Sequence, residues 1–307
     1  MKSSKQVLLS KIEATYGVDP VPTNLLNAMV VSNLKFTPAV ISMEDRNYLM
    51  PWFGGQGKVL NSLYGTLEFD VEIAGSGAAG TVPFWGVHHK ASAMSETINV
   101  GVSVVYAPVS TGEQSATHYY YQDGIKWSLL GARAKKSLKF NAMGIPMQHY
   151  SYTGLRIPAT DTAIVVPTLA TVKPIPVNLA NTTFSLHAFA GVLQEFTVDY
   201  GEEIKYINRP NSEYVNFGGR KMISGSVTME KTTVAIKDWE AVMKAGTTGA
   251  LALVHGTVAG NKYKLDSAIT QITSYDESDS DGVVMVKLGL EFIPGAAGND
   301  DLITTVL

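Results

Sequence analysis

The glycines of Gly75-Ser-Gly-Ala-Ala-Gly80 have the spacing of a dinucleotide-binding turn, and they lie between an expected strand and an expected helix. In nucleotide-binding folds the neighbouring strands are parallel and buried on both faces, so they read as apolar runs. The segment before these glycines, 67–73, is instead half acidic, and no series of strand-helix-strand units follows it. We therefore do not favour a nucleotide site, and an enzyme with a nucleotide at these glycines stays open only as an alternative.

Two other groups of residues have types that could bind metal ions. The run 277–282 resembles the start of a calcium loop, but Leu288 occupies the position that requires a bidentate glutamate, so a solvated hairpin tip is favoured. The histidines show no metal-helix spacing and read as ordinary core or surface residues; they are His88, His89, His118, His149, His187 and His255. No serine lies in a nucleophile elbow. We predict no catalytic residue, no metal and no cofactor, and hence no enzyme.

Two charge patterns remain. Arg133, Lys135, Lys136 and Lys139 form a basic run, which is typical of a solvated edge or, less often, of a subunit contact to a carboxylate. The second pattern places three carboxylates on one face of a strand, at Glu68, Asp70 and Glu72. Neighbouring like charges cost energy unless water screens them, so this face is expected to be wet, either as plain exterior or as the lining of a channel.

The elements that position these residues occur twice. The segment 65–73 alternates apolar and polar residues like a half-buried strand, and 82–91 follows it with helical spacing; 225–230 and 234–245 repeat the pair. Both helices carry Trp-x-x-x-x-Lys-Ala, with Trp85 and Trp239 as their expected core anchors, and Gly246 is expected to end the second helix. Arg46 and Arg209 precede the two strands, each followed by a Gly-Gly pair. Because these matches come in the same order, we interpret the chain as two copies of one domain.

Composition limits the classes of function. The 307 residues exceed a typical single core, and 45% apolar residues suffice for two. A net charge of −3 lacks the basic excess of a duplex-binding protein. The absence of cysteine excludes disulfides and thiolate metal sites. No apolar run has the length of a signal peptide or a bilayer span, so we expect synthesis in a cytosol and no membrane partner.

We divide the chain into an N-terminal arm (1–29), a first domain (30–157), a proline-rich linker (158–183) and a second domain with a C-terminal tail (184–307). The arm has room for one or two helical turns at 7–14 before an extended, proline-punctuated segment. Long loops are expected at 46–63 and 209–225. The first loop is rich in apolar residues and glycine, which indicates either an interaction surface or a loop folded back onto its own core. Its candidate contact residues are Arg46, Tyr48, Leu49, Met50, Trp52, Phe53, Gly54 and Gly55.

Several of these elements together resemble a known family. The segments 14–23 (Ala-Thr-Tyr-Gly-Val-Asp-Pro-Val-Pro-Thr), 106–110 (Tyr-Ala-Pro-Val-Ser) and 122–125 (Gln-Asp-Gly-Ile), with Arg46 and its glycine-rich loop, are similar to the major tail tube proteins of long-tailed, siphovirus-like bacteriophages. The resemblance spans both copies. It implies a mostly β chain with two tandem tail-tube-like β-sandwich or split-barrel domains, each with one short flanking α-helix.

The resemblance also implies a function. Such a chain would be a structural virion protein, made in the host cytoplasm, that forms homotrimeric, pseudo-hexameric rings stacked into the hollow tail tube that conducts DNA during ejection. Its partners would be itself and the tape measure, tail tip and terminator proteins, while genomic DNA would pass without specific binding. The loop 46–63 would bridge rings, and Glu68, Asp70, Glu72 and the matching Glu230 would line the lumen. The alternative is a soluble β-sandwich module that binds carbohydrate or protein through the aromatic loop 48–53.

Overall fold

The computed structural model describes residues 2–307, which form eighteen strands and two short helices, so the expectation of a mostly β fold is confirmed. Every strand pairing within these residues is antiparallel. The first half contains β1 (Gln6–Ile12), β2 (Ser32–Asp45), β3 (Lys58–Glu72), α1 (Gly86–Ala91), β4 (Thr97–Asn99), β5 (Ser103–Tyr106), β6 (Ala116–Gln122), β7 (Ile125–Asn141) and β8 (Met147–Asp161). The second half contains β9 (Thr182–Leu186), β10 (Phe189–Ala190), β11 (Leu193–Asp199), β12 (Glu202–Arg209), β13 (Ser212–Arg220), β14 (Ile223–Glu230), α2 (Trp239–Lys244), β15 (Thr248–His255), β16 (Tyr263–Ser280), β17 (Val283–Phe292) and β18 (Ile303–Val306).

The two halves have the same strand order. In the first half the pairing runs β1-β6-β7-β8-β3-β2, and in the second half it runs β9-β15-β16-β17-β14-β11. In each half a helix follows the strand next to the last strand of this order. Helix α1 follows β3, which lies next to β2, and α2 follows β14, which lies next to β11. This topology supports a duplicated unit, whereas the boundaries at 29, 157 and 183 stay predictions.

The two halves are joined into one sheet. Strand β7 of the first half pairs with β11 of the second, and the C-terminal β18 pairs with both β16 and β5. Most buried apolar side chains of both halves consequently form one continuous cluster, and a small second cluster contains Leu9, Ala28, Tyr119 and Tyr121. Burial of that cluster supplies the main stabilising free energy of the fold.

Both helices are shorter than the sequence pattern predicts. The first begins at Gly86 rather than near Val82, and the second begins at Trp239, where the Asp238 side chain accepts a hydrogen bond from the Ala241 amide at 2.9 Å. Ile236 lies in the range 234–245 that was expected to be helical, but it is 64% exposed, because the chain before Asp238 forms a turn. The expected helix end is confirmed, since Gly246 has φ of 63°.

Three other local expectations are wrong. The segment 7–14 is not helical: β1 pairs with β6 along its whole length, because Leu8 and Leu9 are buried against the first half. The segment 209–225 is not a loop either, since β12 and β13 form a two-stranded hairpin over most of it. The long loop of the first half is confined to 46–57, because 58–63 belongs to β3. The linker runs along the first half, where Thr168 donates to the Asn24 carbonyl.

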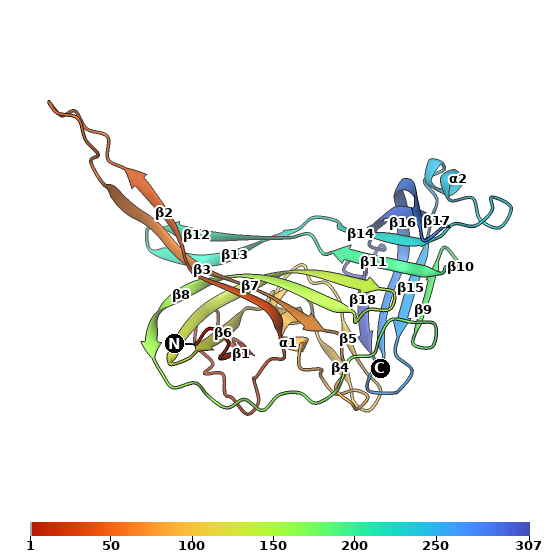
Figure 1. Cartoon of the computed structure of the whole chain (residues 1–307), viewed down its shortest axis with the longest axis horizontal. Helices are drawn as coiled ribbons and strands as arrows, with labels where there is room; N and C mark the ends of the chain where they lie inside the picture. Colours follow the sequence, from red (N-terminus) through yellow and green to blue (C-terminus); the bar gives the residue numbers. More distant parts are fainter. Residues whose placement is uncertain (1) are drawn as a thin grey trace.

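The molecule is a curved slab with one long projection (Figure 1). The β2–β3 hairpin extends far beyond the body at the upper left, whereas β12–β13 lies flat along the upper surface. Tyr206 of that flat hairpin stacks on Tyr64 of β3, with ring centroids 4.6 Å apart. None of the helices formed by residues 2–307 has the length and apolarity that crossing a bilayer requires.

Candidate assembly surfaces

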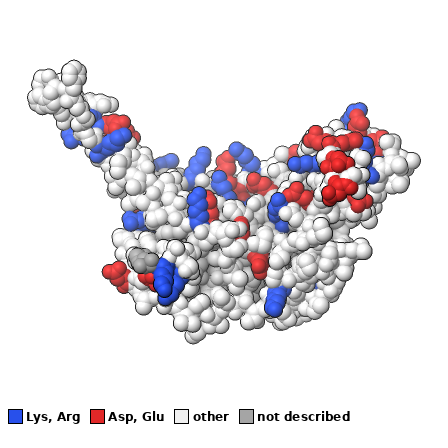
Figure 2. All heavy atoms as spheres, in the orientation of Figure 1, with Lys and Arg blue, Asp and Glu red and all other residues white. Residues whose placement is uncertain are grey.

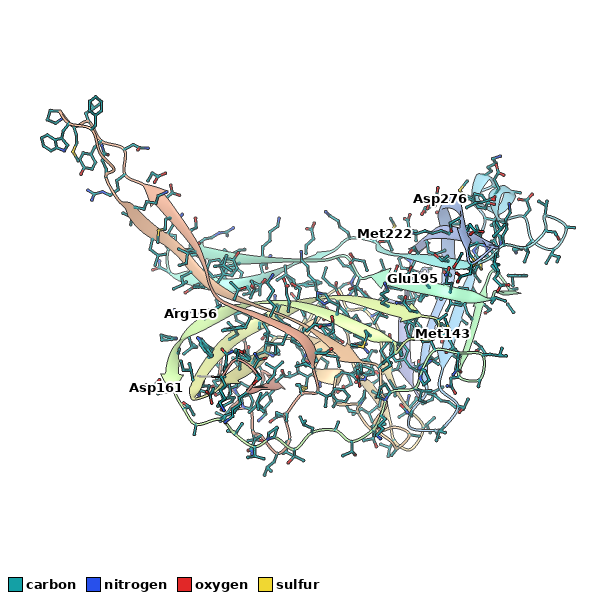
Figure 3. All side chains as sticks on the ribbon, in the orientation of Figure 1. Met143, Arg156, Asp161, Glu195, Met222 and Asp276 are labelled. Atoms are coloured by element: carbon teal, nitrogen blue, oxygen red, sulfur yellow. The ribbon has the colours of Figure 1, made fainter. Side chains whose placement is uncertain are left out.

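The first surface is the joint between β7 and β11. Five residue pairs match along it, from Glu195 opposite Asn141 to Asp199 opposite Ser137. The Lys139 ammonium lies 2.7 Å from the Glu195 carboxylate across the joint. The basic run of β7 is therefore not only a solvated edge, since Lys139 of that run meets a carboxylate of β11. Figure 3 shows Glu195 on β11 at this joint.

A buried polar group closes one end of the joint. Lys136 is buried, with its ammonium 3.6 Å from the centre of the Tyr200 ring and its backbone amide donating to the Glu202 carboxylate at 3.2 Å. Burial raises the pKa of Glu202 to about 7, although the Lys136 charge opposes that shift. Burial likewise lowers the pKa of Lys136 well below its usual range. Glu202 is the first residue of β12, so this buried contact lies where the β12–β13 hairpin leaves the sheet.

The second surface is the polar face of the joined sheet. One line of paired residues crosses six strands without interruption and contains Asp70, His149, Ser137, Asp199, Ser224 and Glu291. The opposite face of the same strands carries the buried core, for example Leu67, Phe69 and Val71 of β3. Alternation along the strands thus separates one continuous wet face from one continuous dry face.

The three carboxylates of β3 lie on this wet face, as their alternation predicts. Glu68 is 3.9 Å from the Lys35 ammonium, and Asp70 is 2.7 Å from Nδ1 of His149. Lys35 adds a positive charge beside these carboxylates, so the face is mixed in sign rather than a purely negative wall. Glu230 lies at the end of β14 and is exposed. Whether these four residues line a lumen stays a prediction.

The third surface is the tip of the β2–β3 hairpin. The ladder continues to the pair Asp45 and Lys58, and residues 46–57 close the tip. Leu49 and Phe53 are fully exposed, and Trp52 is 68% exposed. The alternative that this loop folds back onto its own core is wrong. A hydrogen bond between two residues of the tip helps to hold its conformation: the Gln56 side chain accepts from the Tyr48 amide at 2.6 Å. Arg46 lies over the Tyr48 ring, 5.3 Å from its centre.

The two tryptophans lie where the repeat places them. Trp85 immediately precedes α1 and is fully buried, and its indole donates to the Ala74 carbonyl at 2.7 Å. Trp239 is the first residue of α2, is buried, and meets Phe189 edge to face with centroids 5.7 Å apart. Both side chains belong to the continuous core.

The glycines of the dinucleotide-like turn pack against the second half. A Cβ on Gly75 would lie 2.0 Å from the Gly260 carbonyl oxygen, and the Gly77 amide donates to that same oxygen at 3.0 Å. Glycine is therefore needed here for close approach of two loops. The calcium-like run forms the tip of the β16–β17 hairpin, where Asp281 and Gly282 have φ of 55° and 81°.

Three histidines form a buried cluster between α1 and the sheet. Nδ1 of His88 lies 2.8 Å from the Tyr152 hydroxyl, and Nδ1 of His118 lies 2.8 Å from the Ser10 hydroxyl. His89 contacts the hydroxyl of Tyr150 in the same way. Burial lowers the pKa of His118 from 6.5 to about 3, so the ring is neutral at physiological pH.

A comparison with known protein families identifies the class to which this protein belongs. Residues 3–302 match the family described as phage tail tube protein. Because the match covers nearly the whole chain, this protein belongs to the phage tail tube protein family, and its resemblance to such proteins is confirmed. It is a structural component of the virion tail that assembles with itself and with other tail proteins. No curated protein matches the chain.

The sequence missed the β7–β11 joint and the flat β12–β13 hairpin. The basic run of β7 was the available signal for the joint, since a row of cations on an edge strand needs carboxylates beside it. In 202–207 the apolar residues are Ile204, Tyr206 and Ile207, and this pattern is too short to distinguish a hairpin from a loop.

Proposed function

We propose that three chains form a closed ring and that such rings stack into the hollow tube that conducts DNA during ejection. The observation that carries the proposal is the in-chain joint, where the sheet of one copy continues edge to edge into the sheet of the other. Each chain contributes β2, β3, β8 and β7 from one copy and β11, β14, β17 and β16 from the other. Three chains supply six copies, so the ring is pseudo-hexameric.

Closure follows from the physics of sheet edges. A strand at a free edge has unpaired backbone groups that favour pairing with another chain, and a closed barrel removes every such edge. At one end of the row of strands β2 pairs with β3 alone among residues 2–307. At the other end the upper part of β16 pairs only with β17 among those residues. A ring satisfies both edges at once.

The projecting β2–β3 hairpin supports stacking. Its tip exposes Leu49, Trp52 and Phe53, and burying such side chains gives about 1.5–3 kcal/mol each. Because the hairpin leaves the body, its tip can reach the next ring, and the residues proposed for that contact remain Arg46, Tyr48, Leu49, Met50, Trp52, Phe53, Gly54 and Gly55. The mixed polar face of the joined sheet, including Glu68, Asp70, Glu72 and Glu230, then surrounds the lumen, where DNA slides without specific binding.

Electron microscopy of the purified protein at high concentration tests the proposal. We expect rings with six-lobed walls, and tubes of stacked rings. Deleting 50–57 should leave folded rings that do not stack, whereas the substitution Val258→Ala, at an exposed site away from the tip, should leave tubes intact. Tubes from the deletion variant would refute the inter-ring role of the tip. A dispersed protein whose tip binds a carbohydrate or protein ligand would favour the binding-module alternative.

A further inference from the structure

The part of the β2–β3 hairpin next to the body, which we call the shank (38–43 and 59–64), carries no charged side chain. In Figure 2 it is the pale stretch between the body and a band of charged side chains farther out. Its paired residues Met43 and Leu60 are 51% and 53% exposed, and Ile41 is similarly exposed. Exposed strands in native proteins are usually protected by charged side chains. An uncharged, apolar shank therefore indicates that another surface covers it.

The second half contains the counterpart of this shank, and there it is covered. The β12–β13 hairpin joins β11 to β14 as the outer part of the β2–β3 hairpin joins the paired body parts of its own two strands. It lies across β7 and β8 of the first half. Val215 is fully buried there, Tyr206 stacks on Tyr64, and Asn208 donates to the Asn61 carbonyl at 3.4 Å. The first half thus receives a hairpin from the second half.

The repeat indicates where the second half would receive a hairpin in turn. The corresponding pairs of residues, which lie 160 positions apart in the two halves, are Thr37 with Thr66 and Thr197 with Ser226. The counterpart of Asn61, which accepts from the β12–β13 hairpin, is therefore Lys221. The counterpart of Tyr64 is Ser224. A hairpin received by the second half would accordingly lie over the start of β14.

A groove of about 910 Å³ opens at this place. Lys221 and Met222 line it just before β14, and 291–294 line it at the end of β17. Met222 is 51% exposed, and Figure 3 shows it on the upper surface, the side from which the β2–β3 hairpin leaves the body. Two buried atoms of lining residues, Nε of Arg220 and Oδ1 of Asp301, have no hydrogen-bond partner among residues 2–307. Since buried polar groups are normally paired, the groove has the properties of a surface that a β-hairpin completes.

We propose that the groove of one chain receives the shank of the β2–β3 hairpin of the next chain in the same ring. This inference rests on the proposed ring and adds a contact away from the paired sheet edges. The shank of the same chain does not fill the groove, because four strands separate β2 from β14 in the sheet. Met43 and Leu60 of the shank pack against Met222, and backbone groups of the hairpin pair with Arg220. The tip (46–57) stays free for the next ring.

Cysteine cross-linking tests the contact without background, because the chain has no cysteine. The double variant Met43→Cys/Met222→Cys, treated after assembly with a short bis-maleimide, should give linked species of two and three chains on a denaturing gel. No larger species should form, since the proposed ring closes after three chains. A longer ladder would place the contact between rings and refute the proposal. The matched control Met43→Cys/Val258→Cys, whose second site is exposed but outside the groove, should stay unlinked.

The outcomes separate this inference from the proposed ring. Six-lobed rings of the double variant that do not cross-link would overturn the inference and leave the ring intact, whereas absence of rings from the unchanged protein would overturn both. As a second measurement, Met43→Asp and Met222→Asp should each raise the protein concentration needed for rings about tenfold, because each buries a charge in the contact. Leu49→Asp, at the tip, should leave that concentration unchanged. An effect of Met222→Asp without one of Met43→Asp would assign the groove to another occupant and refute the proposal.

Discussion

Replacing His118 by glutamine should remove one defined part of the protein's sensitivity to acid. The ring is buried and contacts the Ser10 hydroxyl at 2.8 Å, and burial lowers its pKa from 6.5 to about 3. Below pH 6.5 the unfolded chain therefore binds a proton that the folded chain does not bind. The stability due to the neutral ring is complete above pH 6.5 and is lost as pH falls toward 3.

The magnitude follows from the two pKa values. Each pH unit inside that window costs about 1.4 kcal/mol per histidine. Between pH 7.5 and pH 5.0 only the part below 6.5 counts, so His118 should account for a loss of about 2 kcal/mol in the free energy of unfolding. The glutamine variant should lack this part of the acid-induced loss, whatever its stability at pH 7.5.

Urea unfolding at the two pH values, followed by tryptophan fluorescence, provides the assay. Ser10→Ala is the matched control, because it removes the hydrogen bond but keeps the titrating ring, so its pH dependence should equal that of the unchanged protein. If His118→Gln loses as much stability between pH 7.5 and 5.0 as the unchanged protein does, the argument from burial is refuted.

Three further predictions concern the core, the loop contact and the polar face. Trp85→Ala should lower the free energy of unfolding by about 3–5 kcal/mol, because it leaves a cavity at a buried site. The control Trp52→Ala, at an exposed site, should change this free energy by no more than about 0.5 kcal/mol. Similar urea midpoints for the two variants would contradict this prediction. Gly75→Ala should cost about 1–3 kcal/mol, because its Cβ would clash with the Gly260 carbonyl, and the control Gly55→Ala, with open space around it, should be neutral in thermal unfolding. Changing Glu68, Asp70 and Glu72 together to lysine should leave rings in micrographs but slow DNA release from assembled particles, since the added cations attract phosphate. Failure of these rings to form would make the acidic face a contact rather than a lumen wall.

Local periodicity predicted much of the fold. The alternation of 65–73 and 225–230 gave the two central strands, and the Trp-x-x-x-x-Lys-Ala pattern located both helices, although not their first residues. The first residues of the helices were not predicted, because tertiary packing decides whether a residue such as Ile236 is buried. Local periodicity does not specify that packing. The strand at 6–12 was missed because its short apolar run fits a helical turn as well as a strand.

The candidate site was less predictable. The composition of 46–63 indicated either an exposed interaction surface or a loop folded back onto its own core, and the structure decides for the exposed tip. The joint of β7 with β11 depends on contacts between residues far apart in the chain, such as Lys139 and Glu195. No local pattern specifies which of several carboxylates such a lysine meets, so the sequence favoured a solvated edge and left a subunit contact as the less frequent alternative.

The unequal lengths of the two hairpins have a consequence for whatever caps the tube. The β12–β13 hairpin ends against Tyr64 and Asn61 of its own chain, whereas β2–β3 runs on past the body. The proposed ring of three chains would have six similar walls but only three projecting arms. A terminal adaptor with sixfold symmetry would therefore find receptors for only half of its copies, while a threefold adaptor would match every arm.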